Sequence, residues 1–242
     1  MTFKSLSLTV FFAMGLGLLG CDHVSGRPGP GPQVLRPEQQ LDFATLYKAN
    51  CSGCHGANGT HGAAIALSNS VYLAIAGEDI LRSVTAKGVP GTLMPAFAKS
   101  AGGMLSDQQV AVLSHGIVQR WGKPNLLAGQ TSPQYKATSN GDAVRGQQQF
   151  LASCASCHGA NGTGTQKSNG EKIGSIVDPS YLALVSDQAI RSVILAGLPD
   201  QGMPDWRSDS STPMTSQQVT DIVAWMVSLR GTNAGQPYPI RP

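Results

Sequence analysis

The apolar residues of this chain are spaced as in short amphipathic helices. Phe43, Leu46 and Tyr47 lie three and four positions apart, after Pro37 and Glu38, a pair typical of a helix start. No stretch alternates apolar and polar residues for long enough to predict a β-strand. The pattern therefore predicts an all-α protein whose helices are separated by long loops.

Polar residues and glycines predict where several helices begin and end. Asp142 stands where a helix N-cap is expected, and Ser106 and Thr215 are each followed three positions later by glutamine, the spacing of a capping box. Glycine often follows the last turn of a helix, and Gly122 and Gly231 are predicted to end the two helices that these boxes open.

The pattern occurs twice along the chain. The stretch CSGCHGANGT at residues 51–60 returns as CASCHGANGT at residues 154–163, at an offset of 103 positions. Residues 72–97 match residues 181–206 at an offset of 109 positions, so the second copy holds six extra residues between the two matches. Self-similarity over this length predicts two homologous domains.

The repeat and the composition of the stretches around it divide the chain into six segments. Proline and glycine dominate the stretch before the first copy, and polar residues fill the stretch between the copies. The predicted segments are a signal peptide (1–20), a tether (21–37), a first domain (38–122), a linker (123–140), a second domain (141–231) and a C-terminal tail (232–242).

The N-terminal residues predict export. Lys4 precedes an apolar stretch, residues 6–20, which is shorter than the roughly 20 apolar residues that span a membrane. It ends in Leu-Leu-Gly before Cys21 and resembles the lipobox of bacterial lipoproteins, which implies cleavage at Cys21 and a lipid anchor there. An ordinary secretory signal followed by an unrelated cysteine is the alternative. The prediction of a lipoprotein places the chain in the periplasm or at the outer face of the cytoplasmic membrane, anchored by its lipid.

Composition adds two constraints. Aromatic residues make up 6% of the 242 residues, beside 29 glycines and 15 prolines, so each small domain has few large side chains with which to build a core. A bulky apolar group that is not an amino acid would help to fill such a core. The formal net charge of +3 and the lack of a basic stripe argue against nucleic acid as a partner.

The repeated Cys-x-x-Cys-His motif carries the chemistry. Structural zinc would need a second pair of cysteine or histidine ligands in each domain, and thioredoxin-type chemistry would need a βαβ setting; the sequence offers neither. A plain disulfide would not require a histidine directly after each pair. Two thiols three positions apart with an adjacent imidazole, in an exported chain, indicate covalent attachment of a c-type haem.

These motifs resemble those of the two-domain, dihaem members of the class I cytochrome c family. The resemblance covers both predicted domains, and it implies that each is a small helical bundle around one covalently bound haem c. The residues implied to bind the haems are Cys51 and Cys54 with His55 as an axial iron ligand in the first domain, and Cys154 and Cys157 with His158 in the second.

The same resemblance implies a methionine as the other axial ligand of each iron. Met94 and Met203 align at the offset of 109, and both precede a proline, as the family's ligand does. Met104 and Met214 also lie in loops and could compete as ligands, but they do not align with each other.

Two further pairs of residues align around these methionines. Phe97 and Trp206, three positions after each methionine, are interpreted as walls of the haem pockets. Arg82 and Arg191 also align, and each either pairs with a haem propionate or lies on a solvated helix face.

Two filled axial positions leave no open site on either iron, so the implied function is electron transfer and not catalysis. The expected partners are redox proteins and, through Cys21, the membrane; no small-molecule substrate is expected. One alternative is a dihaem subunit of a membrane dehydrogenase or oxidase complex. Another is an enzyme of the dihaem peroxidase type, which would need one haem with an open iron site.

Overall fold

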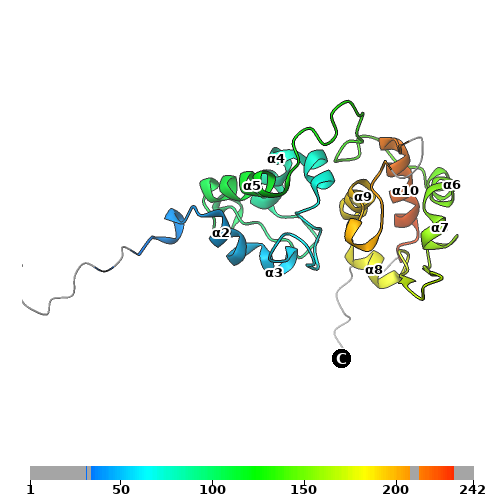
Figure 1. The fold of residues 1–242 in the computed structure, drawn as a ribbon, viewed down its shortest axis with the longest axis horizontal. Coiled ribbons are helices and arrows are strands. Elements are labelled where there is room, and N and C mark those ends of the chain that lie inside the picture. Colours follow the sequence, from blue (N-terminus) through cyan, green and yellow to red (C-terminus); the bar gives the residue numbers. More distant parts are fainter. Residues whose placement is uncertain (1–30, 32–33, 208–212, 232–242) are drawn as a thin grey trace, which may run out of the picture. The chain divides into compact units, whose positions relative to one another are not determined.

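A computed structural model describes residues 31, 34–207 and 213–231 (Figure 1). The chain divides into the residues up to Pro37 and a compact unit that begins at Glu38. The expected signal peptide, Cys21 and the C-terminal tail lie outside the described residues. Within the described part, no helix is both long enough and apolar enough to cross a membrane.

The described residues form helices, as predicted, with one very short sheet. The first half contains η2 (Pro37–Gln39), α2 (Phe43–Asn50), α3 (Ser52–His55), α4 (Ser70–Lys87), η3 (Lys99–Ala101) and α5 (Asp107–Trp121). The second half contains α6 (Ala143–Ser153), α7 (Ala155–His158), β1 (Thr165–Gln166), β2 (Lys172–Ile173), α8 (Pro179–Leu184), α9 (Asp187–Ala196), η4 (Pro199–Gln201) and α10 (Ser216–Ser228).

The first α-helix begins later than the sequence predicts. Pro37 and Glu38 lie in the single 3-10 turn η2, and α2 begins at Phe43. The carboxylate of Asp42 accepts a hydrogen bond of 2.7 Å from the backbone N–H of Thr45. This bond satisfies one of the free donors in the first turn, so Asp42 is the N-cap and fixes where the helix starts.

The predicted N-caps of the later helices are confirmed. Asp142 caps α6, and both capping boxes are complete, Ser106 with Gln109 on α5 and Thr215 with Gln218 on α10. The prediction for Gly122 holds, since this residue is the C-cap of α5.

The prediction for Gly231 is wrong. Helix α10 ends at Ser228; the backbone N–H of its C-cap, Leu229, bonds to the carbonyl of Met226, and that of Arg230 bonds to the carbonyl of Val227. These bonds tighten the last turn, so the helix ends without a glycine.

Each half builds its core where the last helix of the repeat packs against its partners (Figure 1). In the first, α5 lies against α4 and α2 and buries Val110 and Leu113, while the ring of Tyr47 meets that of Trp121 edge-on at 5.1 Å. In the second, α10 lies against α6 and α9, and the ring centroids of Phe150 and Trp225 are 4.3 Å apart.

The middle of each repeat has the same interrupted helix. Inside α4, Gly77 has a φ of +71°, which breaks the helical path. The aligned position in the second half is Ser186, the N-cap that separates α8 from α9. Both halves therefore place two short helical segments end to end between the motif and the Met-Pro loop.

The six extra residues of the second half lie in a hairpin. Strands β1 and β2 pair antiparallel, Thr165 with Ile173 and Gln166 with Lys172, across a turn in which Gly170 has a φ of +85°. Strands of two residues are too short to show alternation in the sequence, and for this reason the hairpin was not predicted. The prediction of an all-α fold is otherwise confirmed.

Candidate functional site

Both Cys-x-x-Cys-His motifs are folded as one tight helical turn. The backbone N–H of Cys51 bonds to Tyr47 at 2.9 Å and that of His55 bonds to Cys51 at 3.0 Å, so α3 continues directly from the end of α2. The second motif repeats this, with His158 bonded to Cys154 at 2.9 Å. A single turn places both cysteines of a motif on one side, with the histidine following at once.

The glycine after each histidine is required by the fold. Gly56 and Gly159 have φ values of +79° and +77°, a region that other residues rarely adopt. A Cβ at Gly56 would also collide with the carbonyl oxygen of Thr60. The glycine therefore lets the chain turn back over the motif, which accounts for the Cys-His-Gly sequence in both copies.

The four motif thiols are free, and each pair has one exposed member. Cys54 and Cys157 are exposed, while Cys51 and Cys154 are half-buried. Burial raises the pKa of both Cys51 and Cys154 to about 11, and the neighbouring cysteine adds to the shift. Before a haem is attached, these half-buried groups are therefore thiols and not thiolates at neutral pH.

Both motif histidines are held in the neutral form. Burial lowers the pKa of His55 and of His158, because desolvation penalises the charged ring. His55 Nδ1 lies 2.8 Å from the carbonyl oxygen of Ile65 and must donate to it, which leaves the Nε2 lone pair free for a metal. Nδ1 of His158 is buried and has no partner in the described part of the chain.

The two Met-Pro segments close onto the preceding helix in the same way. Gly88 and Gly197 cap the ends of α4 and α9 with φ values of +68° and +66°. The backbone N–H after each glycine bonds to the carbonyl of Met94 or Met203 at 3.0 Å, and both methionines are half-buried. A Cβ on either glycine would approach the Met-Pro backbone to 2.6 Å.

Among the described residues, the second half contains two buried ring nitrogens without a partner, and one of them, Nε1 of Trp206, tests whether a haem fits here. Trp206 is 2% exposed, and neither its Nε1 nor Nδ1 of His158 has a hydrogen-bond partner among the described residues. An unsatisfied buried donor costs about 1–3 kcal/mol. A large apolar group that carries carboxylates, as a haem does, can offer an acceptor to Nε1 of Trp206. Nδ1 of His158 lies across the ring from Nε2, the nitrogen available to a metal, and the thiols and imidazole of the motif match the attachment chemistry of a haem.

The structure corrects one option left open for the aligned arginines. Arg191 is 2% exposed, and its guanidinium donates to the carbonyls of Gln134 and Tyr135 and to the hydroxyls of Ser216 and Thr220. Its donors are thus directed to the linker and to α10, not to a haem propionate.

Arg82 also has a protein partner. It lies on an exposed face of α4, where it pairs with Glu78 at 2.8 Å. The same Glu78 carboxylate is 3.0 Å from Nδ1 of His115. The aligned arginines therefore have different surroundings in the two halves.

The competing methionines lie in other surroundings. Met104 is 83% exposed, and Met214 packs at the edge of the second core.

Sequence reasoning missed one functional group, the carbonyl of Ile65, because any residue can supply a backbone oxygen and no side-chain pattern indicates it.

Comparison with known proteins gives two family matches. The model described as Cytochrome c matches residues 143–230, and the model described as Cytochrome C oxidase, cbb3-type, subunit III, matches residues 38–114. Each match includes one of the two Cys-x-x-Cys-His motifs.

One curated relative and one solved structure resemble the chain over most of its length. The Cytochrome bc1 complex cytochrome c subunit of Corynebacterium diphtheriae is 24% identical over 235 residues, which are 91% of this chain and 79% of the relative. A chain of the reducing HAO-like protein complex of Kuenenia stuttgartiensis matches with a TM-score of 0.40 and 16% identity, over 83% of this chain and 99% of that one.

Proposed function

The chain belongs to the class I c-type cytochromes as a two-domain, electron-transfer member with two covalently attached haems c, and on this premise we propose how each haem is held and where the protein works. Each iron is ligated by the histidine of the motif and the methionine of the Met-Pro loop. The two pairs are His55 with Met94 and His158 with Met203.

The motif cysteines attach the haems. In each domain the two thiols would hold a haem by adding across its two vinyl groups, with sulfur bonding to one vinyl carbon and the thiol hydrogen going to the other. The exposed Cys54 and Cys157 are directly accessible for this step, and Cys51 and Cys154 border the interior. The turn of α3 or α7 then holds the neutral imidazole beside the iron.

The equivalent geometry of the two Met-Pro loops carries the proposal. When bound, a haem supplies an iron that changes its valence by one electron. A thioether from Met94 or Met203 gives that iron a soft, neutral ligand, which raises the reduction potential and leaves no position for a substrate. The chain then accepts and donates electrons without making or breaking substrate bonds.

The partners are redox proteins outside the cytoplasm. The signal peptide directs export, and a lipid on Cys21 holds the domains at the membrane through the Pro/Gly-rich tether. A second candidate function is that of a subunit in a membrane redox complex. It is favoured by the likeness to a relative named as a cytochrome bc1 complex subunit.

Paired substitutions test the methionine ligands. Met94→Ala and Met203→Ala should each remove about half of the near-infrared charge-transfer band of the oxidised protein and open one reduced iron to carbon monoxide. Met104→Ala is the matched control, because Met104 is 83% exposed and should leave both signals unchanged. If neither ligand variant changes the band, methionine ligation is wrong.

Fractionation tests the anchor. Cys21→Ser should release the protein from the membrane to the soluble exported fraction with both haems intact. If the variant stays with the membrane alone, without a copurifying partner, the lipid anchor is excluded. If it stays because a partner holds it, the subunit function is supported over that of a free carrier.

A further inference from the structure

The two domains differ in one hydrogen bond next to the proposed iron ligand. Nδ1 of His55 donates to the carbonyl of Ile65 at 2.8 Å, whereas the equivalent Nδ1 of His158 is buried without a partner among the described residues. The rest of the motif is alike in the two domains, from the helical turn to the positive φ of the following glycine. The difference is therefore confined to what surrounds the imidazole.

The longer loop of the second domain explains the difference. In the first domain, the backbone N–H of Ala64 bonds to the carbonyl of Cys54 at 2.9 Å, and this contact brings the next residue, Ile65, over the histidine. In the second domain, the hydroxyl of Thr165 takes that place and bonds to the carbonyl of Cys157 at 2.6 Å.

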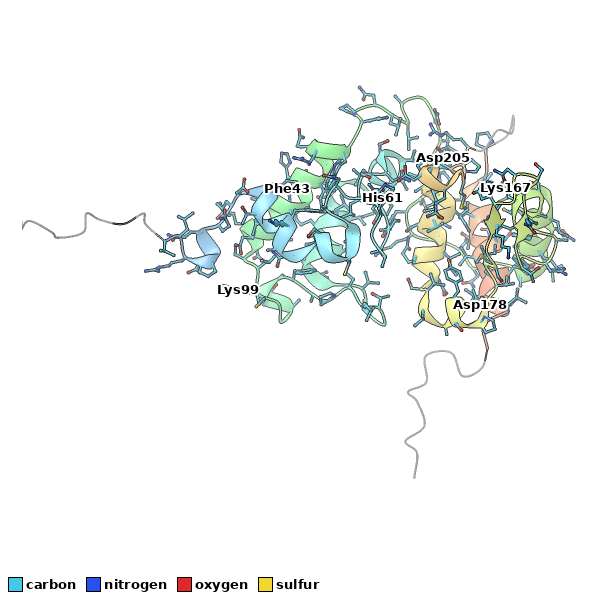
Figure 2. All side chains as sticks on the ribbon, turned by 60° about the horizontal axis from the view of Figure 1, so that its bottom comes forward. Phe43, His61, Lys99, Lys167, Asp178 and Asp205 are labelled. Atoms are coloured by element: carbon cyan, nitrogen blue, oxygen red, sulfur yellow. The ribbon has the colours of Figure 1, made fainter. Side chains whose placement is uncertain are left out.

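From Thr165 the second domain continues into the hairpin, and among the described residues no carbonyl lies within hydrogen-bond distance of Nδ1 of His158. Figure 2 labels Lys167, which follows β1 in this hairpin, and Asp178, the N-cap of α8. Lys167 forms an exposed ion pair of 3.1 Å with Glu171 across the hairpin turn.

A second difference lies at the position three residues after each methionine. The first domain has Phe97, whose side chain carries no polar atom, whereas the second has the buried Trp206, whose Nε1 has no partner among the residues that the structure describes. The positive end of a buried N–H dipole favours the iron state with the smaller positive charge, which is the reduced one.

Two charge effects act on the second domain. A buried positive charge favours the reduced iron, whereas the net acidic charge of the domain favours the oxidised iron. The guanidinium of Arg191 is buried in the second domain, and none of the hydrogen-bond partners given above is a carboxylate. Residues 141–231 also contain two more acidic than basic groups, against an equal number in residues 38–122. Exposed charges are screened by solvent and salt, so contacts inside the domain dominate.

We infer that the haem of the second domain has the higher reduction potential, so that electrons enter the chain at the first domain and leave from the second. A histidine that donates to a carbonyl is a more basic ligand, which stabilises the oxidised iron in the first domain; His158 lacks this support. The inference rests on the proposed His/Met ligation. One electron passes from the reduced first iron to the oxidised second iron, without proton transfer or bond formation.

A redox titration of the full-length holoprotein tests this order. Two one-electron waves are expected, separated by at least 59 mV, a tenfold equilibrium constant for transfer between the irons. Met94→His and Met203→His identify the waves, because exchanging a thioether for an imidazole lowers the potential of that iron. We expect Met203→His to lower the upper wave and Met94→His the lower wave. The reverse assignment, or a single unresolved wave, would overturn the inference.

A second pair of variants keeps the order testable if methionine ligation fails. In that case neither histidine substitution moves a wave. Trp206→Phe gives the second domain the residue of the first, and it should lower only the upper wave; Phe97→Trp is the reciprocal variant and should raise only the lower one. If Trp206→Phe moves the lower wave, the order is reversed.

Nuclear magnetic resonance of the reduced protein, with ¹⁵N-labelled histidine, tests the cause. The Nδ1 proton of His55 should exchange slowly with solvent and be shifted downfield by its hydrogen bond to Ile65. The corresponding proton of His158 is buried too but should lack the downfield shift. Equal behaviour of the two protons would contradict the structural basis of the inference.

Discussion

At the scale of single residues, aligned positions share a residue type without sharing its surroundings. Arg82 and Arg191 occupy the same place in the repeat, yet one lies on an exposed helix face and the other is buried. Sequence reasoning kept a propionate contact open for both. It could not identify the partners of Arg191, because two of them are backbone carbonyls of the linker, which no side-chain pattern marks.

Substituting these two arginines should have unequal effects. Arg191→Ala leaves several buried acceptors unsatisfied, at about 1–3 kcal/mol each, and should lower the free energy of unfolding by about 3 kcal/mol. Arg82→Ala removes an exposed pair and should change it by less than about 1 kcal/mol. Chemical denaturation of the holoprotein measures both. Equal effects would contradict the assigned surroundings, and rescue by Arg191→Lys would contradict the need for a planar, multiple donor.

Asp221 should make the second domain sensitive to acid. Its side chain is 5% exposed; burial alone would raise its pKa, but hydrogen bonds from Arg145, the backbone of Asp142 and Gln217 lower the pKa overall. Its stabilisation is therefore fully present above the unfolded value of about 3.9 and is lost as the pH falls through the folded pKa.

The variant that tests this is Asp221→Asn. It should be less stable than the wild type at neutral pH, and its free energy of unfolding should fall less steeply below about pH 4. Unfolding curves collected at a series of pH values measure the difference. Parallel curves for the two proteins would show that Asp221 is not the acid-sensitive group.

At the scale of elements, features set by neighbouring residues were predicted well, and features that depend on the path of a loop were not. The capping boxes could be predicted because both partners lie within four residues, and the Asp142 cap could be predicted for the same reason. The prediction for Gly231 was wrong, because the last turn of α10 is closed by backbone bonds from Leu229 and Arg230 instead. The carbonyl of Ile65 meets His55 only through the path of the loop, so no local pattern could place it.

The glycine at the end of α9 should control the position of the Met-Pro loop. Gly197→Ala introduces a strained positive φ, at about 1–3 kcal/mol, and a Cβ within 2.6 Å of the Met-Pro backbone. We expect loss of about half of the near-infrared band and a larger loss of stability than strain alone gives.

Gly77→Ala is the matched control for this change. Gly77 also has a positive φ, but no atom of the described residues lies within 4 Å of its Cβ position, so only the strain should remain and the band should be unchanged. An intact band in Gly197→Ala would show that the loop tolerates the contact and that the glycine does not position the methionine.

At the scale of the whole molecule, the prediction of two tandem domains with one haem each followed from the repeat, and the family matches bear it out. The repeat did not indicate that the two domains differ in structure. The identical Gly-Ala-Asn-Gly-Thr stretches after the motifs suggest equal sites, but the six extra residues form a hairpin that changes the contacts of His158. Near-identical sequence in the motif therefore does not determine its surroundings.

Each domain should depend on its haem for a stable core. With few aromatic side chains, the second domain relies on the added apolar surface, so Cys154→Ala with Cys157→Ala should leave one covalent haem and a protease-sensitive second domain. The matched variant, Cys51→Ala with Cys54→Ala, should expose the first domain instead. Limited proteolysis with haem staining measures both. A protease-resistant domain without its haem would contradict a structural role for the cofactor.

The central claim is that both irons are six-coordinate and serve only to transfer electrons, and the spectrum of the wild-type protein tests it most directly. The oxidised holoprotein should show the near-infrared charge-transfer band of methionine-ligated ferric haem at the intensity of two sites. After reduction it should bind carbon monoxide poorly. Band intensity for one site or none, together with rapid carbon monoxide binding, would contradict the account and favour a dihaem enzyme with an open iron.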